Sequence, residues 1–361
     1  MVKTFELVHG KFRSIVRNPR RIKLDDYGEE IIKNLPNSSF RMVLFEEYKN
    51  IDFPIWRRLE MEGLSLPSRP PIVKLETNAK SIYECSKLDI LKEYDFEGSD
   101  RKYVLLADIF HTSGVCFEGS GKISVKMTGD SIDTNVYVID GEAKIKRIFD
   151  GNFRVTNSRF IIKKNAKLYL EDLLFVSGVE VENIFFYIEE NASVEYNDLG
   201  VSKGKVAKAV FVIGEKDSKI VINPRVASSS AADVLYFSRS NVRNMMYVDG
   251  HGVSIGDGKI IFRGIMDIKK GAVGGDYSEK FHTLLLDESS TFEAIPSLYV
   301  QESELSAQHG ASSSPIPDDE LFYLMSRGFD LEEAKTMIAQ GFLLDIDFSK
   351  EAEDFVKRVL K

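Results

Sequence analysis

Cysteine is scarce in this sequence of 361 residues, which contains only Cys85 and Cys116. Two thiols exclude a disulfide framework and any all-cysteine zinc or iron–sulfur site built by this chain alone. Cys116 lies in the alternating segment Gly114-Val115-Cys116-Phe117, so we expect a small buried hydrophobic residue rather than a reactive thiol. The scarcity of cysteine also favours a reducing compartment, and we expect a cytoplasmic protein.

Long apolar runs are absent as well. No stretch approaches roughly 18 uninterrupted apolar residues, so we expect no membrane span. The first residues place His9, Lys11 and Arg13 where a signal peptide needs an apolar core, so we expect no secretory signal.

The common sequence motifs of enzymes are missing too. The chain has no Walker A lysine motif, no HExxH and no GxSxG, which argues against nucleotide hydrolysis and the familiar hydrolase sites. A glycine-rich stretch from Gly250 to Gly258 could suggest a phosphate-binding loop, but the strand-like segment Lys259 to Gly264 follows it instead of a helix. We interpret the stretch as a β turn, and we expect a protein that is not an enzyme.

The charge balance disfavours one class of partner. Lys and Arg number 48 and Asp and Glu number 56, which gives a net charge of −8. Phosphate contacts need clustered positive charge, so we expect no nucleic-acid partner. Hydrophobic residues make up 43% of the chain, which is enough for a folded core.

The first hundred residues are compatible with short helices and loops. The segment Asp25 to Leu35 begins with an acidic pair and stops before Pro36, as a helix commonly does. Further prolines interrupt the chain as far as Pro71. We therefore expect residues 1–102 to form a mixed helical N-terminal region.

From about Tyr103 onward, short runs of Val, Ile, Phe and Tyr alternate with Gly, Asn and Asp, which is typical of many short strands. Within this part, an apolar residue is followed four positions later by a small residue and two positions after that by another apolar residue. The matches are Ile139, Ala143, Ile145; Ile162, Ala166, Leu168; Ile188, Ala192, Val194; and Leu286, Ser290, Phe292, with looser ones at Ser218 and Ala272.

A unit that repeats imperfectly at about two dozen residues predicts a solenoid whose coils stack on one another. Stacked side chains lie about 4.8 Å apart, so corners admit only small residues. Three faces of about six residues would account for the shortest step, with loops in the longer ones. We predict a mainly β protein, with a right-handed parallel β-helix over residues 103–310; an ordinary β-sandwich is the alternative.

Helical patterns replace the strands after the serine-rich stretch Ser306 to Pro317, where we expect the strands to stop. Pro317 and Asp318 begin the first predicted helix, and Gly328 ends it. A capping box of Asp330 and Glu333 begins the second, and we place its end at Gly341. The third begins at Ser349, which completes a C-terminal helical region over residues 311–361.

Five histidines are the remaining candidates for chemistry: His9, His111, His251, His282 and His309. A lone imidazole is a poor metal site, so each is by default a core or surface residue. His309 differs because it lies among small residues where the strands pass into the helices. It could bind a metal only if a partner supplied the remaining ligands.

The segment Leu305-Ser306-Ala307-Gln308-His309-Gly310-Ala311-Ser312 resembles the C-terminal signature of the SufB/SufD family of iron–sulfur cluster assembly proteins. Three further parts of the sequence also resemble this signature: the segment from Leu321 to Phe329, the pair Glu333-Ala334 and the pair Gly341-Phe342. The resemblance is closest over residues 265–342 and extends weakly to 103. It implies a β-helix flanked by helical regions, in agreement with the repeat.

Within the family the sequence is similar to SufD rather than SufB. SufB resembles His-Glu-Ala where this chain has His309-Gly310-Ala311, and the SufB cysteine falls here on Phe281. The resemblance implies a subunit that contributes His309 to an interface with a SufB-type chain and docks on the SufC ATPase, an ABC-type ATPase, through its C-terminal helices. The residues expected to dock are Asp318, Leu321, Phe322, Tyr323, Arg327, Gly328, Ala334, Gly341 and Phe342.

Two alternatives remain open at this point. A β-helical carbohydrate-active enzyme or glycan-binding protein would need paired carboxylates on one face. A homodimer of this chain could also hold a cluster without SufB, although iron–sulfur clusters rarely use only nitrogen and oxygen ligands. We expect the chain alone to bind no stable cofactor, with a transient iron–sulfur cluster in a complex.

Overall fold

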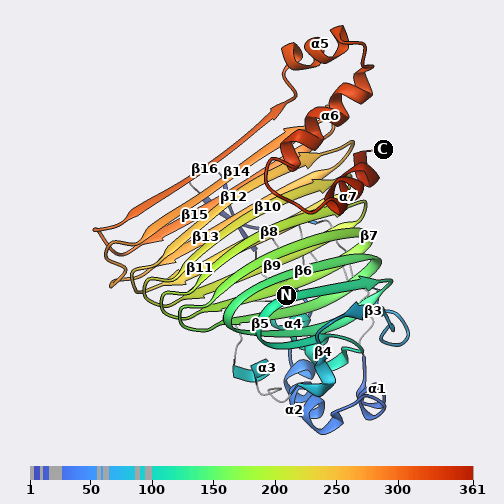
Figure 1. Cartoon of the computed structure of the whole chain (residues 1–361), viewed down its shortest axis with the longest axis vertical. Coiled ribbons are helices and arrows are strands. Elements are labelled where there is room, and N and C mark those ends of the chain that lie inside the picture. The colour runs from blue at the N-terminus through green and yellow to red at the C-terminus, as the bar shows by residue number, and fades with distance from the viewer. Residues whose placement is uncertain are drawn as a thin grey trace.

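The chain folds as a parallel β-solenoid with helices at both ends, as seen in a computed structural model (Figure 1). The structure describes residues 4–8, 11–15, 27–54, 58–59, 65–85, 90–93 and 100–360. His9, Asp25 and Asp26, on which sequence-based expectations drew, lie outside these ranges. The prediction of a mainly β solenoid flanked by helical regions is confirmed.

Each coil of the solenoid contains two long strands, not three short faces. β6 pairs with β5 and β7, and β7 pairs with both β8 and β9. Beyond β7, even-numbered strands pair with one another on one side and odd-numbered strands on the other, in the order β15-β13-β11-β9-β7-β8-β10-β12-β14-β16. The ladders between coils are parallel. The strands are β5 (Val115–Thr128), β6 (Ser131–Ile162), β7 (Lys167–Ile188), β8 (Ser193–Ser202), β9 (Lys205–Gly214), β10 (Lys219–Ser228), β11 (Ala231–Ser240), β12 (Met245–Ser254), β13 (Lys259–Ile268), β14 (Asp276–Leu285), β15 (Thr291–Val300) and β16 (Ser306–Pro315).

The predicted stack of small residues forms one edge of the solenoid. Ala166, Ala192 and Ser218 are buried, and each accepts a backbone hydrogen bond from the next coil at 2.9–3.0 Å. The residue before each of them is Asn or Asp with a φ of 58–63°. Ala143, Ala272 and Ser290 are also buried but lie outside this stack, so the repeat template is right for part of its matches.

Small strands and helices precede the solenoid. They are β1 (Thr4–Val8), β2 (Lys11–Ile15), α1 (Glu29–Lys33), α2 (Ser38–Lys49), β3 (Lys74–Thr77), β4 (Lys80–Ser81), the 3-10 helix η1 (Ile82–Glu84), α3 (Ile90–Glu93) and α4 (Arg101–Phe110). The prediction that strands begin near Tyr103 is wrong, because Tyr103 to Phe110 belong to α4. Every one of these residues is buried, and a helix buried on all sides lacks the periodicity that would distinguish it from strands.

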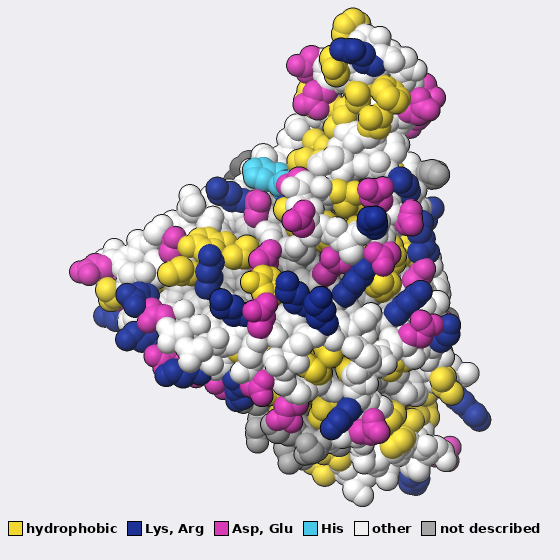
Figure 2. Space-filling view, in the orientation of Figure 1, with side chains coloured by type: hydrophobic (Ala, Val, Ile, Leu, Met, Phe, Trp, Pro, Cys, Tyr) yellow, Lys and Arg dark blue, Asp and Glu magenta, His cyan; other side chains and the backbone are white. Residues whose placement is uncertain are grey.

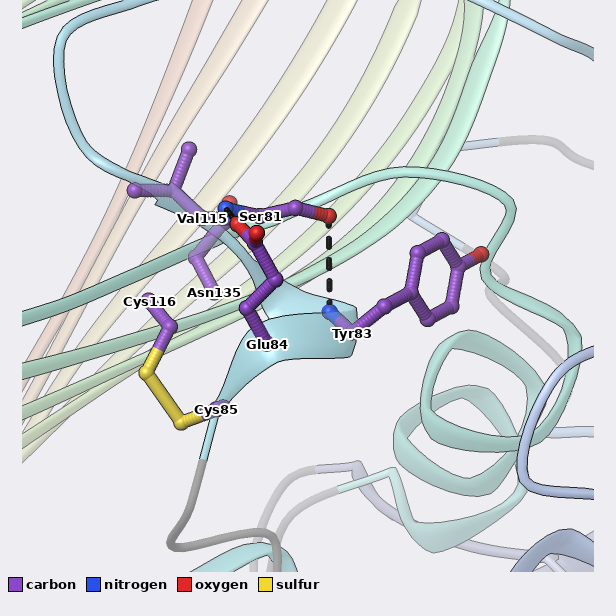
Figure 3. The surroundings of a disulfide bond; sticks show 7 residues. All are labelled: Ser81, Tyr83, Glu84, Cys85, Val115, Cys116 and Asn135. Atoms are coloured by element: carbon purple, nitrogen blue, oxygen red, sulfur yellow. Dashed lines mark hydrogen bonds between the residues drawn. A yellow bond between two sulfur atoms is a disulfide. The ribbon is translucent and has the colours of Figure 1, made fainter.

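The two cysteines are joined in a disulfide, which corrects the prediction that Cys116 is only a small hydrophobic residue (Figure 3). Cys85 follows η1 and Cys116 lies on β5, and their Cα atoms are 5.6 Å apart. Antiparallel pairing of β4 with β5 brings them together, with Lys80 opposite Cys116. Sequence alone could not show this pairing, since it depends on how the N-terminal region folds against the first coil.

The C-terminal region contains α5 (Asp318–Ser326), α6 (Leu331–Leu343) and α7 (Glu351–Leu360). The serine-rich stretch is not a loop, because Ser306–Pro315 forms β16, so the helices begin at 318 rather than 311. The predicted capping box is present, with Glu333 N donating to Asp330 Oδ1 at 2.8 Å. Gly341 does not end α6, which continues to Leu343. Within the described ranges, no helix is long and apolar enough to cross a membrane.

The last two helices lie on one outer face of the solenoid. Leu343 of α6 and Phe355, Val356 and Val359 of α7 pack against buried residues of successive coils such as Leu199. Arg358 adds an ion pair to Asp150 of β6 at 2.6 Å. The apolar face of α7 is therefore used by the solenoid and is not available to cover α5.

We predict that the left-handed corner residues contribute measurably to stability. Asn191→Val should lower the free energy of unfolding by about 1–2 kcal/mol, because a β-branched side chain strains a left-handed backbone. Asn191→Gly should be tolerated, since glycine adopts this conformation without steric cost. Denaturant unfolding of both variants tests this, and equal stability of the two would contradict it.

Candidate functional site

His309 lies at the open end of the solenoid, by which we mean the end formed by β15 and β16 (Figure 1). Strand β16 pairs with β14 along one edge, and β15 pairs with β13. In the part of the chain that the structure describes, no further strand extends this end. His309 is exposed on β16 between Gln308 and Gly310, with the small residues Ala307 and Ala311 beyond them.

Glu279 of β14 is the direct neighbour of His309 across the ladder. Aligned residues of parallel strands point to the same face. Tyr277 and Phe281, two positions before and after Glu279, belong to the interior core. Glu279 and His309 therefore both lie on the interior side of their strands.

Within the described ranges, one oxygen of the buried Glu279 carboxyl group lacks a hydrogen-bond partner. The residue is 1% exposed, and the oxygen without a partner is Oε1. Burial raises the pKa of Glu279 to about 8. Gly264 on the opposite strand β13 makes room, since a Cβ atom there would lie 1.9 Å from the Glu279 carboxyl carbon.

Deeper coils contain a network of buried charges. Arg147 pairs with Asp172, with Nε to Oδ1 at 2.7 Å, and Lys208 Nζ lies 2.8 Å from both Glu182 Oε2 and Asp198 Oδ1. These five side chains are 1–8% exposed. Buried charges are tolerated when paired in this way. The network is closed to a polymeric ligand, so its carboxylates do not form the groove that a carbohydrate-active enzyme needs.

Two carboxylates of the network, Glu182 and the neighbouring Glu180, have opposite pKa shifts. Burial, reinforced by its neighbour Glu182, raises the pKa of Glu180. Burial would also raise the pKa of Glu182, but Lys208 and Arg154 outweigh it and hold that pKa below its usual range. The network thus keeps Glu182 ionised and favours a proton on Glu180.

The other histidines within the described ranges have structural contacts. His111 is buried beside Arg41, and burial lowers its pKa to about 3. The His251 ring stacks on Phe342 at 4.5 Å, and His282 Nδ1 lies 2.7 Å from Ser312 Oγ. No group of three His, Cys, Asp or Glu side chains in the described ranges could hold a metal ion. A metal held at His309 by three or more protein side chains would therefore need ligands from another molecule.

The predicted docking residues divide between two environments. On and just after α5, Phe322 is 74% and Tyr323 57% exposed, and Asp318, Arg327 and Gly328 are exposed with them. No residue of α5 is buried, and Leu321 is half-buried. On α6, Ala334 is buried, Gly341 is exposed, and Phe342 is half-buried against His251.

Exposed apolar side chains gather over α5 and α6, at the top of the view in Figure 2. Besides Phe322 and Tyr323, the set contains Met325, Phe329, Leu331 and Met337, each 38–46% exposed. We call these six residues the apolar tip. Contiguous exposed apolar surface of this kind is typical of a protein interaction site.

The predicted turn at the glycine-rich stretch is confirmed for its second half. Gly250 and Gly252 lie within β12, whereas Gly256 and Gly258 lie in the turn that leads to β13. Gly256 has a φ of 57°, which suits a turn glycine.

Glu279 was not among the residues that the sequence singled out. The available signal was a glutamate at an inward position of a strand, between Tyr277 and Phe281. Glu279 can be recognised as an inward-facing residue only from the register of β14, and the repeated pattern of small and apolar residues does not extend over that strand.

We predict that Glu279 makes stability depend on pH. Because the pKa of Glu279 is raised in the folded state, its contribution to the free energy of unfolding is fully present below the unfolded pKa of about 4.5 and is lost as the pH rises toward about 8. Between pH 5 and pH 8, the free energy of unfolding of Glu279→Gln should fall by about 2 kcal/mol less than that of the wild type. Denaturant unfolding across this range measures it. The exposed Glu195→Gln is the matched control and should keep the wild-type slope, and an unchanged slope in Glu279→Gln would contradict the prediction.

Comparisons with known proteins bear on the region that contains both Glu279 and His309. The family model described as SUF system FeS cluster assembly, SufBD core domain, matches residues 136–342. Iron-sulfur cluster assembly SufBD family proteins of Staphylococcus aureus (strain USA300) and Staphylococcus haemolyticus (strain JCSC1435) are each 36% identical over 111 residues. These matches cover 29% of this chain and 24% of each relative.

The family match spans more than half of the chain, including most of the solenoid and the helices α5 and α6. It agrees with the resemblance drawn from the segments around His309 and Phe342. The chain therefore belongs to the SufBD family of iron–sulfur cluster assembly proteins.

Proposed function

We propose that this chain is a SufD-like subunit of an iron–sulfur cluster assembly complex, acting as a scaffold and not as an enzyme. The observation that carries the proposal is the exposed His309 on a strand whose outer edge pairs with no other described strand. A histidine in this position is available to a second chain. Phe281, where SufB is expected to have a cysteine, is fully buried and stacks on Phe262 at 4.9 Å.

The free edges of β15 and β16 support pairing with a SufB-type homologue or with a second copy of this chain. An edge strand presents unpaired backbone donors and acceptors, so another strand can extend the sheet there. Such pairing would bring the partner's side chains to His309. An iron–sulfur cluster would then be held transiently, as the cargo of the assembly, by ligands from both chains.

The apolar tip supports docking of a SufC-type ABC ATPase. It combines an exposed aromatic centre with charges at its margin, namely Asp318 and Arg327, which is the usual composition of a recognition patch. The tip belongs to helices that continue directly from β16, the strand of His309. Movement of the docked ATPase would therefore act on the cluster interface.

We predict that Phe322 is an anchor of this docking surface. Phe322→Ser should weaken binding of the SufC-type ATPase at least tenfold, because removing a central aromatic anchor commonly costs about 2 kcal/mol or more. Calorimetric titration of the full chain measures this. Ile72→Ser is the matched control, since Ile72 is 91% exposed and lies far along the chain from α5. Unchanged affinity of Phe322→Ser would place the docking surface elsewhere.

We predict that His309 acts in cluster assembly and contributes little to folding. His309→Ala should reduce cluster formation in the reconstituted complex and change the free energy of unfolding by about 1 kcal/mol or less, because the side chain is exposed. Anaerobic reconstitution with absorption spectroscopy, together with thermal melting, measures both quantities. A large loss of stability, or cluster formation at the wild-type level, would contradict the role assigned to His309.

A further inference from the structure

We propose that Glu279 and His309 together form half of a binding site for a divalent transition metal such as ferrous iron, at the open end of the solenoid. The site rests on the proposed function, because the chain paired with β16 would supply the second half of its ligands. Beyond the proposed function, the site gains a carboxylate ligand next to the imidazole and a defined class of ion.

The register of the two strands places Glu279 next to His309. Glu279 and His309 are directly paired residues of β14 and β16, and both lie on the interior side of their strands. Neighbouring strands are about 4.8 Å apart. A carboxylate and an imidazole at this spacing can converge on one ion, because each ligand atom lies only about 2 Å from a bound transition metal.

The carboxyl group of Glu279 is buried at a cost in free energy. A buried carboxyl group with no partner costs free energy, and Oε1 of Glu279 has none within the described part of the chain. Gly264 provides the space that this carboxyl group occupies. The strand sequence thus keeps an acidic group, at a cost, one ladder step from the outermost strand.

The surroundings favour a cation as the group that completes the site. Tyr277 and Phe281 flank Glu279 and are fully buried, and a low local dielectric strengthens attraction between a carboxylate and a cation. On β16, the small residues Ala307 and Ala311 leave the approach to His309 unobstructed. Ferrous iron accepts both nitrogen and oxygen ligands, so one ion can bind the imidazole and the carboxylate together.

The test is anaerobic titration of the full, tag-free chain with Fe²⁺, and with Co²⁺ as a spectroscopic substitute. The wild-type chain should bind one equivalent at metal concentrations up to about 1 mM. Glu279→Gln and His309→Ala should each weaken binding at least tenfold. His282→Ala is the matched control, because His282 lies on β14 but on its outer side, and this variant should bind as the wild type does.

Three results would overturn the proposal: no stoichiometric binding by the wild type, unchanged binding by Glu279→Gln, or equal loss in His282→Ala. Thermal melting of each variant shows that a loss of binding is not a loss of folding. The outcome is independent of the docking titration with Phe322→Ser, because no partner is present here. Failure of ATPase docking would count against the proposed function and leave the metal result standing. Failure of metal binding would count against the metal site and leave the docking result standing.

Discussion

The hydrogen-bonded register between successive coils is the constraint on which the rest of this structure depends. Because the strands are parallel and pair residue by residue over ten positions, each interior side chain has an equivalent directly above and below it. Small residues at the corner, stacked aromatic rings such as Phe160 on Phe186 at 5.0 Å, and the pairing of Glu279 with His309 all follow from it. A shift of one residue would turn every interior side chain outward.

The same constraint explains how charges are placed inside the solenoid. Arg147 and Asp172 occupy paired positions on β6 and β7, so their contact is fixed by the ladder rather than by flexible side chains. Towards the open end the interior becomes apolar, and within the described ranges Oε1 of Glu279 has no partner. Asp172 and Glu182 are ion-paired, whereas Glu279 is not paired to a described residue, and this contrast distinguishes the open end as a site.

Sequence reasoning recovered the solenoid because a corner every 26 residues, as from Ala166 to Ala192 to Ser218, needs small residues that are visible without coordinates. It failed where the deciding contacts are non-local. Residues 103–110 are buried on every side because α4 packs against the first coils, and all of them except Asp108 are apolar or aromatic. Ser306–Pro315 looks like a loop because an edge strand has little to bury. Glu279 became identifiable only through its neighbours on β13 and β16, and the pairing of Cys85 with Cys116 only through β4.

The composition of β16 has a consequence for solubility in the absence of a partner. A ten-residue edge strand is a template on which further strands can add without limit, the process that leads to fibrous aggregates. Serine-rich strands with glycine and a terminal proline, here Gly310 and Pro315, bury little apolar surface and interrupt such growth. The strand is thus polar enough to remain unpaired while retaining the backbone geometry that a specific partner needs.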